Sequence, residues 1–195
     1  MEYQDLVLTG RIGIGKTTVL EKAVRALEKK GKRVAGILTH ETVEDGKRSG
    51  FEVIDVESGE HRVLARMSAG GRRNAVSYPT GKDGKIKTLS SHYDFVQGGF
   101  DFADAVYERL LSKSPQDLIV VDELGLFESR GEGFQNAVGL IRKTNRPPMA
   151  VIVRKDILDR ILPMFPGNPR VLEVNEKNRD RLPDTVEKHF LGKVR

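Results

Sequence analysis

Eight consecutive residues near the N-terminus have the types and the spacing of a loop that binds phosphate groups. Glycines at fixed positions let a backbone turn tightly, so that its N–H groups point inward at phosphate oxygens. A lysine after the last glycine is long enough to reach the β- and γ-phosphates, and the next hydroxyl suits Mg²⁺, which prefers hard oxygen ligands. The run that matches this pattern at every fixed position is Gly10-Arg11-Ile12-Gly13-Ile14-Gly15-Lys16-Thr17.

The surroundings of this run are those that a phosphate loop requires. Leu6–Thr9 has the composition of a short buried strand, and apolar residues recur at helical spacing across residues 17–30. That helix would add its positive N-terminal end to the site. We therefore expect a nucleotide to bind along Gly10–Thr18, with Lys16 on its phosphates and Thr17 also on the metal ion.

A second candidate element is an apolar strand that ends in two acids. Residues 118–121 read Leu-Ile-Val-Val, and Asp122 and Glu123 follow directly. Asp122 could hold Mg²⁺ through a water molecule, complementing Thr17. Glu123 could orient, or accept a proton from, the water that attacks the γ-phosphate. Such a strand could also end in two solvated acids, but beside a complete phosphate loop the catalytic interpretation is favoured.

Strands and helices alternate along most of the chain, which predicts an α/β fold with a mainly parallel sheet flanked by helices. A turn at Ser58-Gly59 between two short apolar runs predicts an additional antiparallel hairpin. No linker divides the chain, so we expect a single domain over residues 1–195. The expected ranges are strands at 34–39, 51–56, 61–65, 149–153 and 171–174, short strands near Val76 and Ile86, and helices at 100–111, 134–143, 157–162 and from Pro183.

Composition narrows the classes of protein and of site. The chain has 195 residues and no cysteine, so disulfides, thiolate metal sites and cysteine nucleophiles are excluded. No apolar run is long enough to span a membrane and no signal peptide is visible, so we expect a cytoplasmic protein. The net charge of +5 is spread along the whole chain, which makes nucleic-acid binding possible but does not favour it.

Taken together, the motifs resemble those of the THEP-type nucleoside-triphosphatases, and the matches follow the family's order over nearly the whole chain. The phosphate loop alone would not single out this family, whereas the combination does. The further matching elements are Gly36-Ile37-Leu38-Thr39-His40-Glu41, Arg48-Ser49-Gly50-Phe51, Val121-Asp122-Glu123-Leu124-Gly125 and Val174-Asn175-Glu176-Lys177-Asn178-Arg179-Asp180-Arg181-Leu182-Pro183.

This resemblance implies Mg²⁺-dependent hydrolysis of nucleoside triphosphates to diphosphate and phosphate, with little selectivity for the base. It also implies a RecA-like sheet in which the strand before Asp122 lies between the phosphate-loop strand and the second strand. Two segments depart from the family's pattern. Residues 72–100 lack its arginine-valine-glycine-lysine-tyrosine run, and Phe127-Glu128-Ser129 replaces its usual methionine-glutamate-leucine.

Several other charged or polar residues have two open interpretations each. Arg48, in an expected loop before the hairpin, is either an arginine finger for the γ-phosphate or a solvated arginine. Arg154 follows an expected strand, at the edge where ligands of such sheets collect, and either contacts the nucleotide or lies on the surface. Asn178 and Arg179 follow the last expected strand, where they contact the base or brace the final turns. Glu41 either aids the metal shell or is solvated.

Three alternative functions stay open at this point. A nucleotide or metabolite kinase would use the same phosphate loop and needs an arginine-rich lid, which Arg66, Arg72 and Arg73 could supply. A nucleic-acid-coupled ATPase needs a basic track. A nucleotide-dependent switch would bind without turnover. An acid directly after Asp122 favours water as the nucleophile, and therefore a hydrolase.

Overall fold

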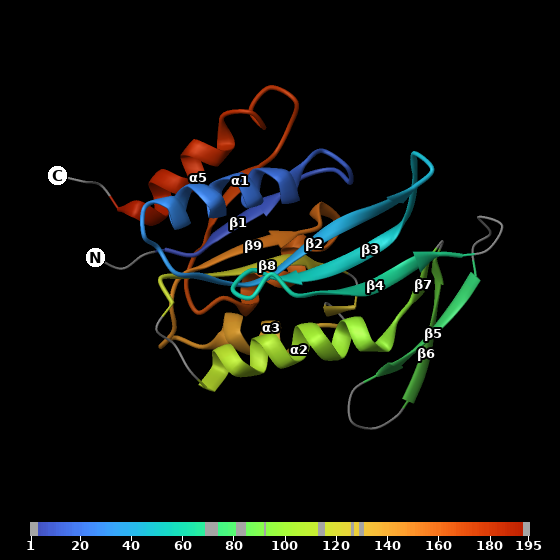
Figure 1. Cartoon of the computed structure of the whole chain (residues 1–195). Helices are drawn as coiled ribbons and strands as arrows, with labels where there is room; N and C mark the ends of the chain where they lie inside the picture. Colours follow the sequence, from blue (N-terminus) through green and yellow to red (C-terminus); the bar gives the residue numbers. More distant parts are fainter. Residues whose placement is uncertain are drawn as a thin grey trace.

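The computed structural model describes residues 4–68, 74–80, 85–91, 93–112, 116–125, 127–128 and 131–192, and of 74–80 and 85–91 it describes the backbone. Arg72 and Arg73 of the kinase alternative lie outside the described residues. In the described part of the chain, the main sheet has the strand order β10 (Arg170–Glu173), β1 (Leu6–Thr9), β9 (Met149–Val153), β8 (Leu118–Leu124), β2 (Val34–Glu44), β3 (Lys47–Asp55), β4 (His61–Met67) and β7 (Tyr93–Phe95) (Figure 1).

The main sheet is parallel on one side and antiparallel on the other. From β10 to β2 every neighbouring pair is parallel, so the carboxyl ends of these strands meet at one edge. From β2 to β7 every pair is antiparallel. The strand β8, which carries the two acids, lies between β1 and β2 as the family resemblance implied, with β9 inserted between β8 and β1.

Helices cover both faces of the sheet, as Figure 1 shows. Alternate side chains of each strand point to opposite faces, so Leu6 and Leu8 of β1 join one buried cluster and Val7 joins the other. The cluster of Leu6 and Leu8 packs under α1 (Lys16–Lys29) and α5 (Leu182–Leu191). The other packs under α2 (Gln97–Ser112) and α3 (Gln135–Arg142).

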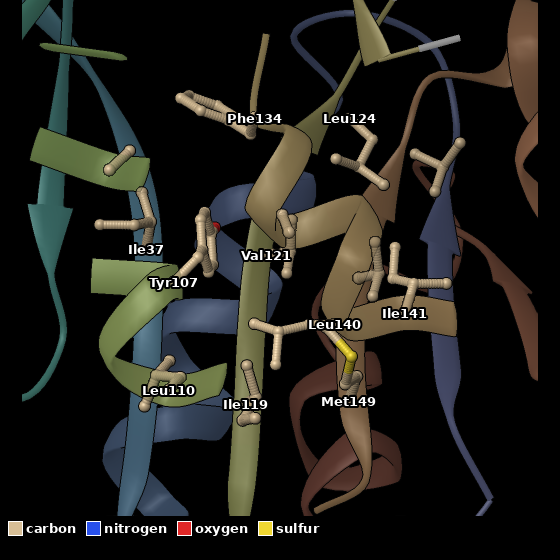
Figure 2. Close-up of a cluster of buried hydrophobic side chains, with 14 of the residues drawn as sticks. Ile37, Tyr107, Leu110, Ile119, Val121, Leu124, Phe134, Leu140, Ile141 and Met149 are labelled. Carbon is tan, nitrogen blue, oxygen red and sulfur yellow. The ribbon is translucent and has the colours of Figure 1, made fainter. Parts of the chain in front are cut away.

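The cluster under α2 and α3 reaches the edge where the carboxyl ends meet. Figure 2 shows Tyr107 of α2 among Ile37 and Val121, with Leu124 and Phe134 at the same end of the cluster. Leu124 ends the acid-bearing strand and Phe134 immediately precedes α3. The core therefore continues directly beneath the segment that carries the acids.

Two differences from the expectations concern the antiparallel side of the sheet. Instead of ending at residue 39, β2 continues to Glu44 because its second half pairs with β3, a partner that periodicity within one strand does not reveal. The hairpin is also part of the main sheet, not an appendage to it. The expected strands near Val76 and Ile86 are confirmed as β5 (Asn74–Thr80) and β6 (Lys85–Ser91), which form a separate two-stranded sheet.

The α-helix after β9 is shorter than the expected range of residues 157–162. The chain passes through a 3₁₀ turn (Lys155–Ile157), α4 (Leu158–Ile161) and a second 3₁₀ turn (Leu162–Met164). Pro163 lies in the second turn, where it limits regular helix. Among the described residues, no helix combines the length and the apolar character needed to cross a membrane.

Candidate functional site

The predicted phosphate loop joins β1 to α1 at the edge where the carboxyl ends meet. Gly13 and Gly15 have φ angles of 74° and 100°, in the left-handed region that favours glycine, and a Cβ on either would meet nothing within 4 Å. Gly10 has φ of 148° and meets a second constraint, because a Cβ there would lie 2.6 Å from the carbonyl oxygen of Val174. The loop is therefore shaped by backbone conformation and by close approach of the chain that follows β10.

Lys16 is held inside this loop. Its residue exposure is 6%, and its Nζ donates to the carbonyl oxygens of Gly10 and Arg11 at 3.4 and 3.3 Å. The same Nζ lies 3.1 Å from a carboxylate oxygen of Glu123. The structure thus brings together Lys16 and Glu123, two of the three residues that the sequence offers as catalytic, the third being Arg48. A phosphate group entering the loop would compete with Glu123 for this ammonium group.

Asp122 lies beside the start of α1. Its residue exposure is 1%, its carboxylate accepts a hydrogen bond from the Thr39 N–H at 3.2 Å, and the Thr17 hydroxyl also donates to it. The Thr39 hydroxyl donates to the Asp122 carbonyl, so Thr39 fixes both the backbone and the side chain of this aspartate. The pKa of Asp122 is raised to about 7, mainly by burial and in smaller part by the charge of Glu123.

The oxygen atoms of Thr17 and Asp122 suit a magnesium ion. The described residues contain no group of three or more His, Cys, Asp or Glu side chains that could hold a metal. Mg²⁺ bound with a nucleotide does not need such a cage, because phosphate oxygens and water supply most of its ligands. One hydroxyl and one carboxylate in contact with each other, next to the phosphate loop, fit that requirement.

Glu128 is a buried acid of the site that sequence reasoning did not assign. Its residue exposure is 3%, and its two carboxylate oxygens accept from the N–H groups of Gly125 and Phe134 at 2.7 and 2.9 Å. Burial raises the pKa of Glu128, while these two hydrogen bonds lower it. No signal in the sequence distinguishes this residue from a solvated loop acid, although it occupies the glutamate position of the family's pattern.

A pocket adjoins the phosphate loop and brings Arg154 to the site. Its volume is about 490 Å³, and its lining is Gly10, Arg11, Ile12, Arg154, Lys155 and Asp156. The Arg154 guanidinium donates to the Asp156 carboxylate at 3.0 and 2.7 Å, which lowers the pKa of Asp156. The Arg154 N–H also donates to the carbonyl oxygen of Leu124 at 3.2 Å, so the end of β9 is tied to the acid-bearing strand.

The segment after β10 lies against the phosphate loop. Arg11 and Glu176 form an exposed ion pair, which joins the two loops. The Asn178 side chain accepts from the Asn175 N–H at 2.8 Å and donates to the Glu173 carbonyl at 2.8 Å, so it braces this turn. Arg179 is exposed in the same turn. The structure therefore brings the predicted base-contacting segment to the site and gives Asn178 a bracing role there.

The expectation that Arg48 lies in a loop is wrong. Arg48 is the second residue of β3 and pairs with Val43, because the extended β2 supplies a partner for the residues before the hairpin. Its guanidinium bonds to the Glu41 carboxylate and to the Tyr93 hydroxyl, the latter at 3.5 Å. Glu41 is thereby occupied by Arg48, so both residues lie on the antiparallel side of the sheet.

Comparisons with known proteins point to one family. A family model described as NTPase matches residues 5–187. The chain is similar to proteins named nucleoside-triphosphatase THEP1 from Methanopyrus kandleri (33% identity, covering 96% of this chain and 95% of the relative) and Methanosarcina barkeri (31%, covering 95% and 96%).

Two solved structures resemble the fold. One is THEP1 from Aquifex aeolicus, with a TM-score of 0.67, 23% identity and coverage of 93% of this chain and 96% of that chain. The other is a human cancer-related nucleoside triphosphatase, with a TM-score of 0.68, 25% identity and coverage of 94% and 95%. The α/β architecture with its eight-stranded sheet is thus shared with these structures.

Proposed function

Because the chain belongs to the NTPase family, we propose that it hydrolyses nucleoside triphosphates to nucleoside diphosphate and phosphate. The observation that carries the proposal is the convergence of the phosphate-loop lysine and the acid that follows Asp122. Lys16 Nζ and a Glu123 carboxylate oxygen are 3.1 Å apart at the edge of the sheet, with the Thr17–Asp122 pair beside them. A cation suited to binding phosphate, a candidate base and two oxygens suited to a metal ion thus lie close together, which supports the proposal.

The proposed reaction is an attack of water on the γ-phosphorus. A bond forms between the water oxygen and the γ-phosphorus, the bond from the γ-phosphorus to the bridging β–γ oxygen breaks, and the water proton goes to Glu123. The Lys16 ammonium stabilises negative charge on the β- and γ-phosphate oxygens, together with the inward N–H groups of the phosphate loop. The side chain of Glu123 is 30% exposed, so water can reach it.

We further propose that Thr17 and Asp122 hold Mg²⁺, with Asp122 acting through a water molecule. When bound, the ion would neutralise the negative charge that develops on the phosphate oxygens. Gly10, Arg11, Ile12, Gly13, Ile14, Gly15 and Thr18 would contact the nucleotide along the loop. Arg154 lines the adjoining pocket and is proposed to contact the nucleotide. Asn178 and Arg179 are proposed to contact the base.

The strand order supports a RecA-like arrangement, since the acid-bearing strand is separated from the phosphate-loop strand by one other strand. Three further proposals rest on the sequence alone, namely a single domain over residues 1–195, little selectivity among bases and a cytoplasmic location. Of the kinase alternative's arginines, Arg66 is described and lies exposed on β4. No specific observation favours the kinase, the switch or nucleic-acid coupling over hydrolysis.

The test is phosphate release from ATP, GTP, CTP and UTP, with and without Mg²⁺, for the wild type, Lys16→Ala and Glu123→Gln. We expect Mg²⁺-dependent release from several nucleotides that Glu123→Gln lowers about 10²–10⁴-fold, because it removes the base. Lys16→Ala should also abolish release. Nucleotide binding by Glu123→Gln should persist, since Lys16 and the loop are intact. Tight binding by the wild type without release, unless an acceptor is added, would contradict hydrolysis and support the kinase.

A further inference from the structure

The segment between β8 and α3 contains an internal clamp made by one buried side chain. Glu128 accepts from the Gly125 N–H with one oxygen at 2.7 Å and from the Phe134 N–H with the other at 2.9 Å. Gly125 comes directly after β8, and Phe134 directly precedes α3. We call the Glu128 carboxylate and these two N–H groups the Glu128 clamp. One carboxylate oxygen binds each end of the segment. The clamp therefore fixes the distance between the end of β8 and the start of α3.

The clamp lies two residues from the candidate base. On the far side of Glu123, Asp122 is fixed by Thr39. On the near side, the Leu124 carbonyl accepts from the Arg154 N–H at 3.2 Å, and Gly125 is held by Glu128. The regular pairing of β8 with β9 shifts between Val121 and Leu124, so the ladder itself does not fix the stretch that contains Glu123. Its position depends on the anchors on either side.

The space around the Glu128 carboxylate is closed. A Cβ on Gly133 would lie 2.0 Å from the Glu128 oxygen that binds Phe134, and 2.8 Å from the Phe127 Cβ. Phe127 itself packs edge-on against Phe95 with ring centroids 5.0 Å apart. The absence of a side chain at Gly133 therefore leaves the room that the Glu128 carboxylate occupies.

We propose that Glu128 is a positioning residue, whose carboxylate holds Gly125, and through it Glu123, at the place beside Lys16 where the attacking water is activated. The inference rests on the proposed hydrolase function. It goes further than that function by assigning a required role to a buried residue whose two carboxylate oxygens are both held by backbone N–H groups. A misplacement of a catalytic group by about 1 Å can cost about 10²-fold in rate, so losing this positioning should lower kcat by a readily measured factor.

A purely structural role would look different. The bond from the Phe134 N–H to Glu128 also stabilises the start of α3, and losing that stabilisation alone would lower the stability of the fold without changing the rate per folded molecule. Positioning predicts a fall in kcat per nucleotide-binding site with KM unchanged, because the phosphate loop is not altered. The stability of the fold and kcat per binding site, measured for the same variant, therefore separate a structural role from a positioning role.

The first variant is Glu128→Gln. The carboxamide has one acceptor oxygen, so one of the two N–H groups would face its NH₂ group and the clamp would open at one end. We expect kcat per binding site to fall about 10- to 100-fold, with KM within two-fold of the wild type. Binding-site concentration is measured by titration with a nucleotide analogue, so that partial unfolding does not imitate a loss of rate.

The second variant opens the clamp while Glu128 itself is kept. Gly133→Ala places a methyl group at 2.0 Å from the Glu128 oxygen and must displace it. Gly131→Ala is the matched control, because Gly131 has φ of 79° against 66° for Gly133, and a Cβ on Gly131 would meet nothing within 4 Å. Both substitutions strain a left-handed backbone, but only Gly133→Ala reaches Glu128. We expect Gly133→Ala to reproduce the kcat loss of Glu128→Gln, and Gly131→Ala to retain wild-type kcat.

The outcomes separate this inference from the proposed function. Wild-type kcat per binding site in both Glu128→Gln and Gly133→Ala, with the wild type active and Glu123→Gln inactive, would overturn the clamp's role and leave the hydrolase intact. An equal loss in Gly133→Ala and Gly131→Ala would also overturn it, since strain alone would then explain the effect. A wild type that releases no phosphate from any nucleotide would overturn both proposals.

Discussion

The two loops that build the site lie at the same edge of the sheet but are held in different ways. The phosphate loop is shaped by its backbone, with glycines at left-handed φ angles and with Arg11 and Ile12 exposed to solvent. The segment after β8 is shaped by buried side chains, with Glu128 inside and Phe127 packed on an aromatic cluster. A loop held by its backbone must keep glycines at fixed spacing, whereas a loop held by side chains can use many residue types.

The two elements also bury different ionisable groups, since the phosphate loop buries the Lys16 ammonium and the acid-bearing strand buries the Asp122 carboxyl. The pKa of Asp122 is raised from 3.8 to about 7, chiefly by burial. Between these values the unfolded chain has lost the proton and the folded one keeps it. Metal-free stability should therefore fall as pH rises through this window and level off above pH 7, by roughly 4 kcal/mol at about 1.4 kcal/mol per unit.

This prediction is measured by urea unfolding with EDTA between pH 4 and pH 8, for the wild type and Asp122→Asn. Asparagine cannot ionise, so the difference in unfolding free energy between the two proteins should grow with pH in favour of the variant up to about pH 7. The comparison of the pair removes the contribution of other titrating groups. A difference that does not change with pH would show that Asp122 is not shielded from water as the structure indicates.

Much of this contrast could be predicted from the sequence, and the rest could not for physical reasons. The phosphate loop, the parallel strands and the pair Asp122-Glu123 follow from local spacing, and the structure brings Lys16 to Glu123 as expected. Glu128 could not be found, because its partners are backbone N–H groups that any sequence provides. The extension of β2 to Glu44 depends on pairing with β3, which is a property of two strands together.

A smaller test concerns the two constraints within the phosphate loop itself. Gly10→Ala would push a methyl group to 2.6 Å from the Val174 carbonyl oxygen, a backbone atom that cannot rotate away. Because Gly10 also has φ of 148°, we expect Gly10→Ala to destabilise the fold by about 1–3 kcal/mol from overpacking, in addition to the strain of a positive φ. Gly13→Ala meets open space and should cost about 1 kcal/mol, from its left-handed φ of 74° alone. Urea unfolding at fixed pH compares the two variants.

Equal losses for Gly10→Ala and Gly13→Ala would mean that the segment after β10 yields freely, and that the phosphate loop is not braced by it. A larger loss for Gly10→Ala is the expected result, because both substitutions strain a positive φ and only Gly10→Ala adds the clash with the Val174 carbonyl oxygen. In that case the difference between the two loops is one of degree, because each would rely on a neighbouring element.

The smallest expected effect is that of Arg48→Ala, which tests how far the site extends onto the antiparallel side of the sheet. Arg48 pairs with Val43, four residues beyond Thr39 and therefore about 13 Å along β2 at about 3.3 Å per residue. Its guanidinium is already bonded to Glu41 and to the Tyr93 hydroxyl. We expect kcat for Arg48→Ala to stay within about two-fold of the wild type, because its guanidinium is paired on the antiparallel side, and loss of this exposed pair should cost at most about 1 kcal/mol of stability. A fall of about 10³-fold or more in phosphate release would instead identify Arg48 as an arginine finger, and would require the hairpin of β2 and β3 to close over the phosphate loop during turnover.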